Sequence, residues 1–321
     1  MTTVVFGGAG FVGLNIAEAL LSRGEAVTLF DREAPPEAAQ CAFRDLPGSL
    51  SVVTASVLDA DAVAAAMEGA HGAVYGAAVT AGLERDRTAP ETTLAVNLDG
   101  LMNALRAAHT AGCRAFINLS SAGAFGAAAF RHDVLREDTP TDPVSLYSIT
   151  KYASERITSR MASVWAMNAL SVRLSGVFGR WERKTSVRDT PSPQHQILRA
   201  AQVEAPVILP RPEARDWIYA TDVASAVIAL RDADRLPHDL YHVSTGTRWS
   251  VADWTAELAT HMPSLRWRMA EPGEAATIDY HAAQDRGMLS IDRLLADADY
   301  RPAFTLSASA ADYAAWAQRS G

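Results

Sequence analysis

Short apolar runs rich in β-branched residues alternate with amphipathic stretches through the first half of the chain. The runs that predict strands are Thr3–Phe6, Ala26–Phe30, Ser51–Thr54, Ala73–Tyr75, Ala115–Leu119 and Leu170–Leu174. Between the first two of them, Val12, Ile16 and Leu20 recur every four residues and predict a helix over Phe11–Ser22. Strands that alternate with helices of this length are typical of a parallel sheet with helices on both faces.

This rhythm ends at about residue 176. The stretch Gly179–Pro212 is rich in Arg, Pro, Ser and Gln and has one short helical pattern, around Gln196–Val203. Asp216–Leu230 then predicts a strand and a helix that return to the sheet, and Leu240–Val243 predicts a further strand. We therefore predict an α/β fold, a Rossmann-type doubly wound parallel sheet with a smaller C-terminal lobe. The predicted division is residues 1–176 plus 216–245 for the sheet domain and 177–215 plus 246–321 for the lobe.

Composition and charge narrow the class of partner. Of the 321 residues, 49% are hydrophobic and 21% are charged, which is an ordinary globular mixture. The net charge of −8 and the isoelectric point near 5.5 argue against nucleic acid or an anionic membrane. Cys41 and Cys113 have no metal-ligand spacing, so we predict reduced thiols and no bound metal. The chain enters a strand without a basic, apolar leader and has no apolar run of membrane-spanning length, so we expect a cytoplasmic protein.

Glycines follow the first predicted strand at a regular spacing. Gly7, Gly10 and Gly13 open the first helix, where they would allow a tight turn, a close approach to a pyrophosphate and close helix–strand packing. Asp31 ends the second strand, where a carboxylate accepts hydrogen bonds from the adenosine ribose and repels a 2′-phosphate. The pattern therefore predicts a dinucleotide site that prefers NAD to NADP, although the neighbouring Arg32 could tolerate the phosphate.

A second pattern supplies candidate chemistry. Tyr147 and Lys151 stand four residues apart and would share one helix face. Oxidation of a secondary alcohol needs a base for the hydroxyl proton, and a nearby ammonium makes a tyrosine a better base by lowering its pKa from near 10. Ser121, on the loop after the fifth predicted strand, could hydrogen-bond the substrate oxygen. We therefore predict hydride transfer at a secondary alcohol or ketone.

With these motifs the whole chain resembles the extended short-chain dehydrogenase/reductase family, in its NAD-dependent epimerase/dehydratase group. The motifs that carry the resemblance are Gly7–Gly13, Asp31, Ala77-Ala78, Val96-Asn97, Leu119–Ser121, Phe125-Gly126, Tyr147–Lys151, Val172–Gly179 and Arg215–Val223. The resemblance implies that Tyr147 is the acid/base, that Lys151 holds the ribose and tunes Tyr147, and that Ser121 orients the substrate. The predicted cofactor contacts are Gly7, Gly10, Phe11, Val12, Gly13, Asp31, Arg32, Ser56, Val57, Ala77, Ala78, Asn97, Leu119, Tyr147, Lys151 and Val177. Of these, Ser56 and Val57 would flank the adenine, Ala77 and Ala78 would line the cofactor trench, and Val177 would lie near the nicotinamide.

Three departures from the family pattern bear on the substrate. Dehydratases of the family carry Asp-Glu after the catalytic hydroxyl residue, whereas Ala122-Gly123 follow Ser121 and cannot donate a proton. Members that bind nucleoside diphosphate sugars usually have an asparagine where this chain has Ser175, which weakens that class of substrate without excluding it. The basic loop Arg180–Arg188 together with Arg215 predicts either an anion clamp or a solvated surface loop. The predicted substrate contacts are Ser121, Ser175, Arg180, Arg188 and Arg215.

Three functional hypotheses remain. A dehydrogenase/reductase that acts on a sugar-like or hydroxy-acid substrate in the substrate-binding lobe is slightly favoured. A nucleoside-diphosphate-sugar epimerase with tightly bound NAD would share the first hydride transfer. A catalytically silent dinucleotide-sensing regulator is disfavoured because the tyrosine and lysine are both present. The segments Thr93–Ala111 and Leu146–Met167 resemble the helices through which family members form dimers, so we expect a homodimer.

Overall fold

The computed structural model describes residues 1–80, 82–185, 190–280 and 282–320. Within these residues the main sheet has seven strands, all parallel, in the order β12-β7-β5-β4-β1-β2-β3. Its strands are β1 Thr2–Phe6, β2 Ala26–Asp31, β3 Ser49–Thr54, β4 Gly72–Tyr75, β5 Ala115–Ser121, β7 Ala169–Leu174 and β12 Leu240–Val243. Seven of the predicted strands are present in this sheet, with ends within two residues of those expected, and the Rossmann-type prediction is confirmed. The strand predicted within Asp216–Leu230 is β11 Ile218–Tyr219, but it pairs with β8 Val177–Phe178 outside the main sheet, so that part of the prediction is wrong.

The strand order creates a reversal point beside β1, and the region at that point is called the crevice below. The chain moves outward from β1 to β3 and then returns to β4 on the other side of β1, so the carboxyl ends of β1 and β4 meet where the direction reverses. Phe6, at the end of β1, is paired with both Phe30 and Tyr75. Open sheets of this kind bind their ligands at such a reversal point.

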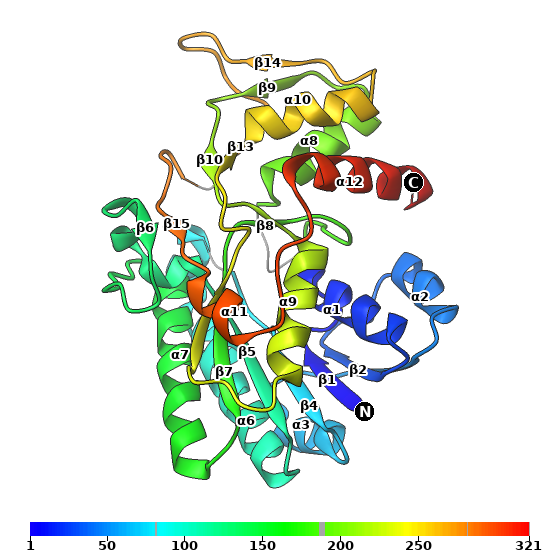
Figure 1. Cartoon of the computed structure of the whole chain (residues 1–321), viewed down its shortest axis with the longest axis vertical. Helices are drawn as coiled ribbons and strands as arrows, with labels where there is room; N and C mark the ends of the chain where they lie inside the picture. Colours follow the sequence, from blue (N-terminus) through cyan, green and yellow to red (C-terminus); the bar gives the residue numbers. More distant parts are fainter. Residues whose placement is uncertain (81, 186–189, 281, 321) are drawn as a thin grey trace.

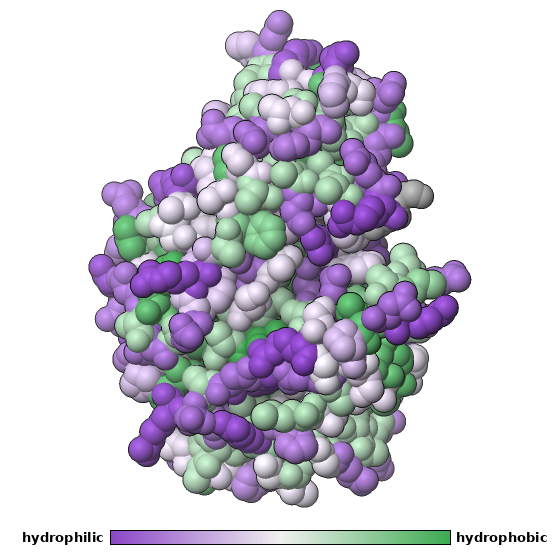
Figure 2. All heavy atoms as spheres, turned by 45° about the vertical axis from the view of Figure 1, so that its right-hand side comes forward, coloured by the Kyte–Doolittle hydropathy of each residue, from purple (hydrophilic) through white to green (hydrophobic). Residues whose placement is uncertain are grey.

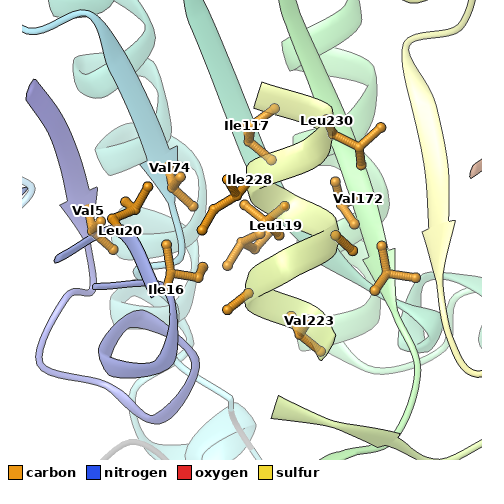
Figure 3. Packing of buried hydrophobic residues seen from close by; sticks show 14 of the residues in the cluster. Val5, Ile16, Leu20, Val74, Ile117, Leu119, Val172, Val223, Ile228 and Leu230 are labelled. Atoms are coloured by element: carbon orange, nitrogen blue, oxygen red, sulfur yellow. The ribbon is translucent and has the colours of Figure 1, made fainter. Parts of the chain in front are cut away.

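Helices cover both faces of the sheet. The helices are α1 Phe11–Ser22, α3 Ala60–Met67, α6 Gly100–Thr110, α7 Leu146–Trp165 and α9 Ala220–Asp232. Helices α1 and α9 pack against each other on one face, where Leu20, Val74, Leu119 and Ile228 interdigitate (Figure 3). Helices α3, α6 and α7 cover the other face. Each buried aliphatic side chain of this size contributes about 1.5–3 kcal/mol, so the sheet is a rigid base for the ends of its strands.

The long helix α7 has clear local signals at both ends. Ser145 caps its first turn by accepting a hydrogen bond from the backbone N–H of Ser148, and the Ser148 hydroxyl accepts from the Ser145 N–H. This reciprocal cap fixes where the helix begins. The helix ends at Ala166, which adopts the left-handed conformation with φ of 52°. The cap Ser145 therefore sets the start of α7 at Leu146, one residue before Tyr147.

A second core lies beyond the sheet, at the top of Figure 1. It is built by α8 Pro193–Gln202, β9 Val207–Leu209, α10 Val251–His261, β14 Trp267–Met269 and α12 Leu306–Ser320. Phe178, Trp254 and Tyr313 pack together inside it. Figure 2 shows this part as a separate bulge, with a notch on the right between it and the sheet below. The predicted helix around 196–203 exists but begins at Pro193, because Ser192 caps it and proline suits a first helical position.

The remaining elements are short segments between those already named. They are α2 Glu37–Arg44, α4 Leu83–Thr88, α5 Pro90–Leu94, a π-helical turn Ala95–Asp99, 3₁₀ turns Ala122–Phe125 and Ala127–Phe130, β6 Val134–Leu135, β8 Val177–Phe178, β10 Ala214–Arg215, β11 Ile218–Tyr219, β13 Trp249–Ser250, β15 Met288–Leu289 and α11 Asp292–Asp297. Helix α11 packs against β12 of the main sheet although it lies late in the chain. Among the described residues, no helix combines the length and the apolar character that a bilayer crossing requires.

Candidate active site

The glycine loop between β1 and α1 leaves no room for a side chain at Gly7 or at Gly13. Gly7 has φ of +74°, and a Cβ there would lie 2.6 Å from the backbone nitrogen of Ala77. A Cβ on Gly13 would lie 2.5 Å from the carbonyl oxygen of Gly7. Gly10 donates its N–H to the same carbonyl at 3.0 Å. The loop is therefore a bare backbone cradle, which is what close approach of a pyrophosphate requires.

Helix α1 points its first turn at this loop. Gly10 is its N-cap residue, and in the described part of the chain no side chain caps it. By contrast, Ser145 caps α7 and Ser250 caps α10. A helix N-terminus without a side-chain cap presents backbone donors and a partial positive charge to a bound anion. The cradle and the helix end together fit a dinucleotide phosphate.

Asp31 lies at the carboxyl end of β2 beside the loop. Its Oδ2 accepts a hydrogen bond from the Ala9 N–H at 3.0 Å, and its Oδ1 accepts one from the Glu33 N–H at 3.4 Å. Burial raises the pKa of this carboxyl, and the backbone donors partly offset that rise. Arg32 is exposed next to it. Asp31 therefore lies beside the glycine loop, and its contact with a ribose stays a prediction.

Other predicted cofactor residues lie around the same crevice. Ala77 abuts Gly7, as the distance above shows, and the Val57 carbonyl accepts a hydrogen bond from Asn103. The Ser56 hydroxyl accepts a hydrogen bond from the Leu58 N–H at 3.2 Å. Placed alongside them are Ala78, Phe11 and Val12, which are buried or half-buried. These cofactor contacts stay predictions.

Asn97 forms hydrogen bonds within the chain, and its predicted contact with the cofactor stays a prediction. It lies buried in the π-helical turn, where its Oδ1 accepts from the Val79 N–H at 2.8 Å. Its Nδ2 donates to the Thr150 hydroxyl at 2.9 Å. The amide therefore ties the loop after β4 to α7, next to Lys151, and π-helical turns are frequent at functional sites.

Lys151 is buried behind the crevice with its charge directed at the end of β5. Its Nζ donates to the Leu119 carbonyl at 2.7 Å, and the residue is 6% exposed. Burial lowers the pKa of Lys151 to about 8, and the charge of Glu155 partly opposes that shift. The Nζ lies 5.9 Å from the centre of the Tyr147 ring. The predicted pair thus shares one helix face, as its spacing required.

Ser121 and Tyr147 converge on one point. A Cβ placed on Gly123 would lie 3.3 Å from the Ser121 Oγ and 3.4 Å from the Tyr147 Cε1. The Ser121 Oγ accepts a hydrogen bond from the Gly123 N–H at 3.0 Å, which holds the side chain at the end of β5. The Ser121 hydroxyl and the Tyr147 ring therefore both border Gly123 at the end of β5, where Lys151 Nζ also binds the Leu119 carbonyl.

A buried ion pair lies one turn further along α7. Glu155 accepts hydrogen bonds from Arg173 Nε at 2.8 Å and Nη2 at 2.7 Å, and from the Ser120 hydroxyl at 2.5 Å. The sequence interpretation missed this pair. Its signal was present in the spacing of Tyr147, Lys151 and Glu155, which stand at positions i, i+4 and i+8 of one face. The pair holds α7 against β5 and β7, and so it helps to set the position of Lys151, one turn earlier on α7, relative to the end of β5.

Two of the predicted substrate residues after β7, Ser175 and Arg215, form hydrogen bonds within the chain. The Ser175 hydroxyl donates to the Asp216 carbonyl at 2.6 Å and accepts from Arg286, which the sequence interpretation also missed. Arg215 Nη2 donates to Glu213 at 2.6 Å, and burial lowers the pKa of this guanidinium. Half-buried Val177 packs on the sheet core. Whether these residues contact substrate stays a prediction.

The structure describes only part of the basic loop Arg180–Arg188. Arg180 forms a double hydrogen bond with Asp312 and lies 4.0 Å from Glu18, so its charge is matched by acids of the chain itself. Arg188 lies outside the described residues. No contact joins Arg180 and Arg215 among the described interactions, and the predicted clamp stays untested.

The reversal-point crevice of this doubly wound sheet defines a dinucleotide-binding α/β protein. Residues 3–243 match the model of the NAD dependent epimerase/dehydratase family. The chain belongs to that family, which confirms the predicted resemblance. The family's cofactor is NAD, in agreement with the prediction from Asp31.

Individual relatives differ in what their names describe. A 3 beta-hydroxysteroid dehydrogenase/Delta 5-->4-isomerase from Mycobacterium tuberculosis is 32% identical over 187 residues, which are 56% of this chain and 48% of that protein. The chain thus spans about half the length of that relative. A UDP-glucose 4-epimerase from Corynebacterium glutamicum is 28% identical over 302 residues, 87% of this chain and 86% of that protein.

Solved structures support the fold. MoeE5 in complex with UDP-glucuronic acid and NAD superposes with a TM-score of 0.79 at 21% identity, over all of both chains. A UDP-glucose 4-epimerase from Thermotoga maritima gives a TM-score of 0.80 at 17% identity, over 99% of each chain. At this level of identity the likeness establishes the architecture.

Proposed function

We propose that this protein is an NAD-dependent oxidoreductase that transfers a hydride at a secondary alcohol or ketone. The observation that carries the proposal is the convergence of Ser121 and Tyr147 at Gly123, with the Lys151 ammonium buried beneath. A dinucleotide-binding protein without chemistry has no need of a charged lysine held in a buried position, which costs free energy. The same convergence supports assigning Tyr147, Lys151 and Ser121 as the catalytic residues.

The proposed roles follow from the positions of these groups. Tyr147, as phenolate, takes the proton of the substrate hydroxyl, and the hydrogen on the same carbon leaves as a hydride. NAD, when bound, accepts that hydride. Lys151 stabilises the phenolate by its charge and supports the ribose, while Ser121 donates a hydrogen bond to the substrate oxygen as it becomes a carbonyl.

Charge balance around the predicted substrate residues favours an uncharged, polyhydroxylated substrate over a diphosphate. Three arginines, Arg211, Arg215 and Arg286, are paired with three acids, which are Glu213, Asp216 and Asp285. An incoming diphosphate would have to compete with carboxylates that already hold these cations. Two buried donors, Arg215 Nε and Trp217 Nε1, have no hydrogen-bond partner among the described residues. Single donors of this kind suit hydroxyl or carbonyl oxygens.

A second candidate is a nucleoside-diphosphate-sugar epimerase. The observation that favours it is the likeness to the Corynebacterium glutamicum UDP-glucose 4-epimerase, which covers 87% of this chain. Such an enzyme would return the hydride to the other face of the bound ketone. Ser175 would then have to replace the asparagine that serves nucleotide-sugar enzymes of the family.

Two substrate panels separate the candidates. The purified protein is incubated with NAD and either free sugar acids and polyols or nucleotide sugars, while NADH absorbance and product epimers are followed. Sustained NADH formation with a free substrate is the expected result. A new nucleotide-sugar epimer without released NADH would replace the first candidate by the second. Inactivity on both panels, with NAD bound, would point to the sensing regulator.

We further propose a homodimer located in the cytoplasm. Leu94, Ile149 and Val164 lie in or beside the two segments predicted for the dimer interface and are 41%, 45% and 53% exposed. Apolar side chains exposed at this level along helices suit a helical interface. Cys41 and Cys113 are both free thiols, as a reducing compartment would keep them. A monomer-sized species in light scattering at micromolar concentration would contradict the dimer.

We propose the predicted division into a sheet domain and a lobe, with helix α11 moved to the sheet domain. The second core supports a substrate-binding lobe made of residues 177–215 and 246–321. The packing of α11 against β12 supports counting that helix with the sheet domain. Limited proteolysis should then release no fragment that separates α11 from the sheet.

A further inference from the structure

The segment that follows β8 is fastened along α1. The Arg180 carbonyl accepts a hydrogen bond from Asn15 Nδ2 at 2.8 Å. The next residue, Trp181, donates its indole N–H to Glu18 at 2.7 Å and packs edge-on against Phe43 with ring centres 5.5 Å apart. These contacts hold Arg180 and Trp181, which belong to the predicted lobe, against α1 and α2 of the sheet domain.

Arg183, two residues further on, reaches the glycine loop. Its Nη2 donates to the Ala9 carbonyl at 2.8 Å. The N–H of the same alanine donates to Asp31. Ala9 is therefore held at its N–H by a carboxylate and at its carbonyl by a guanidinium that comes from 174 residues away in the chain.

The other terminal nitrogen of Arg183, Nη1, indicates that a ligand binds here. Nη1 is buried and has no hydrogen-bond partner among the described residues. A buried guanidinium N–H without an acceptor is costly, and such a donor in a folded protein calls for an explanation. The guanidinium is planar, so a group that donates to Ala9 through Nη2 keeps Nη1 close to the same loop.

The acceptor that suits this place is a phosphate oxygen. The loop is the bare cradle of Gly7, Gly10 and Gly13, and α1 presents its N-terminus there without a side-chain cap. Both features favour an anion, and the family binds NAD. A guanidinium can serve two acceptors at once, whereas an ammonium is a point charge.

We propose that Arg183 binds the pyrophosphate of NAD through Nη1 while Nη2 keeps its hydrogen bond to Ala9. The cofactor site then includes a residue outside the glycine motif, supplied by the segment that leads into the second core. Because this segment is fastened to α1, bound cofactor ties the two parts of the molecule together. The inference does not depend on which substrate the protein uses.

The test is the affinity for three ligands, measured by calorimetry on the full chain freed of bound nucleotide. Arg183→Gln is expected to raise the Kd of NAD and of ADP-ribose by about 10- to 100-fold, since a charge-assisted hydrogen bond is lost. The Kd of adenosine, which has no phosphate, is expected to stay within about 2-fold. Arg199→Gln is the matched control, because Arg199 lines the same pocket as Arg183 but bonds to Gln202. It should leave all three affinities unchanged.

Two results would overturn the proposal. One is an unchanged Kd for NAD in Arg183→Gln. The other is an equal loss for NAD and adenosine, which would mean that the arginine only supports the loop. If Arg183→Gln fails to fold, Arg183→Lys takes its place, because it keeps the charge but cannot serve both acceptors in the same plane. It should still weaken NAD about 3-fold or more with adenosine unchanged, and full retention of NAD affinity would also refute the assignment.

Discussion

The crevice on the sheet and the loops after β7 both carry polar residues that the sequence marked as functional, but they differ in how those residues are satisfied. In the crevice, α1 has no side-chain cap among the described residues, and Lys151 holds a buried charge on a backbone carbonyl. After β7, Arg180, Arg215 and Arg286 each pair with a carboxylate of the chain. The first region is prepared to receive a partner, whereas the second is largely satisfied. Polar groups left without internal charge partners therefore mark the chemistry better than basic composition does.

The strongest way to test the crevice is to remove its acid/base. Tyr147→Phe should lower kcat by about 1,000-fold, within the usual range for a general acid–base group. The Kd of NAD should change little, because the ring remains. Tyr152→Phe on the same helix is the control and should keep most of the turnover. If Tyr147→Phe kept its full rate, the convergence of Ser121 and Tyr147 would have no catalytic meaning.

The glycine cradle gives the next largest effect. Gly7→Ala combines a left-handed φ of +74° with a Cβ 2.6 Å from a backbone atom, so the loop must shift. We expect a loss of about 3 kcal/mol in the free energy of unfolding and a severe loss of NAD affinity. Gly24→Ala is the matched control, because its φ is +78° but nothing lies within 4 Å of the added Cβ. It should cost about 1 kcal/mol, the strain alone. Equal losses in urea unfolding would show that close approach is unimportant at Gly7.

Lys151 makes the stability depend on pH in a defined window. Its folded pKa of about 8 lies below the ordinary 10.5, so between these values the unfolded chain binds more protons and stability rises with pH. Below pH 8 the cost of burying the charge is fully present. Lys151→Met removes that cost, so its advantage over the wild type should be largest below pH 8 and shrink by about 3 kcal/mol by pH 10.5.

Urea unfolding from pH 6.5 to 10.5 measures this difference. Lys151→Met also loses the hydrogen bond to Leu119, which lowers its free energy of unfolding by about 1 kcal/mol at every pH. Lys184→Met, at an exposed lysine, is the control and should show no such trend. A difference between Lys151→Met and wild type that is constant over the whole range would contradict the lowered pKa.

What could be predicted from the sequence depends on whether the residues concerned lie in one element or in several. The helix Phe11–Ser22 and the place of Tyr147 and Lys151 on one helix face were predicted correctly, because each depends on spacing within one element. Glu155 with Arg173, and Arg183 with Ala9, were missed because each joins residues from different elements. For the same reason the basic loop could be recognised but its partners could not: Asp312, which pairs with Arg180, lies 132 residues later in the chain.

The ion pair of Arg180 and Asp312 should give the smallest change in stability, and it tests the difference between the crevice and the loops after β7 most directly. Arg180→Gln should lower the free energy of unfolding by about 1–2 kcal/mol, since the pair is only partly shielded from water. A double-mutant cycle with Asp312→Asn should give a coupling of about 1 kcal/mol, whereas the exposed pair Arg114 and Asp234 should give less than about 0.5 kcal/mol.

The kinetic measurement decides between a structural pair and an anion clamp. If Arg180 belongs to the structure, Arg180→Gln changes stability and leaves the KM of anionic and neutral substrates in the same ratio. If it is part of a clamp, stability stays near wild type and the KM of anionic substrates alone rises about 10-fold. The second result would mean that a bound anion displaces Asp312 from Arg180, and the loops after β7 would then be as open to a ligand as the crevice.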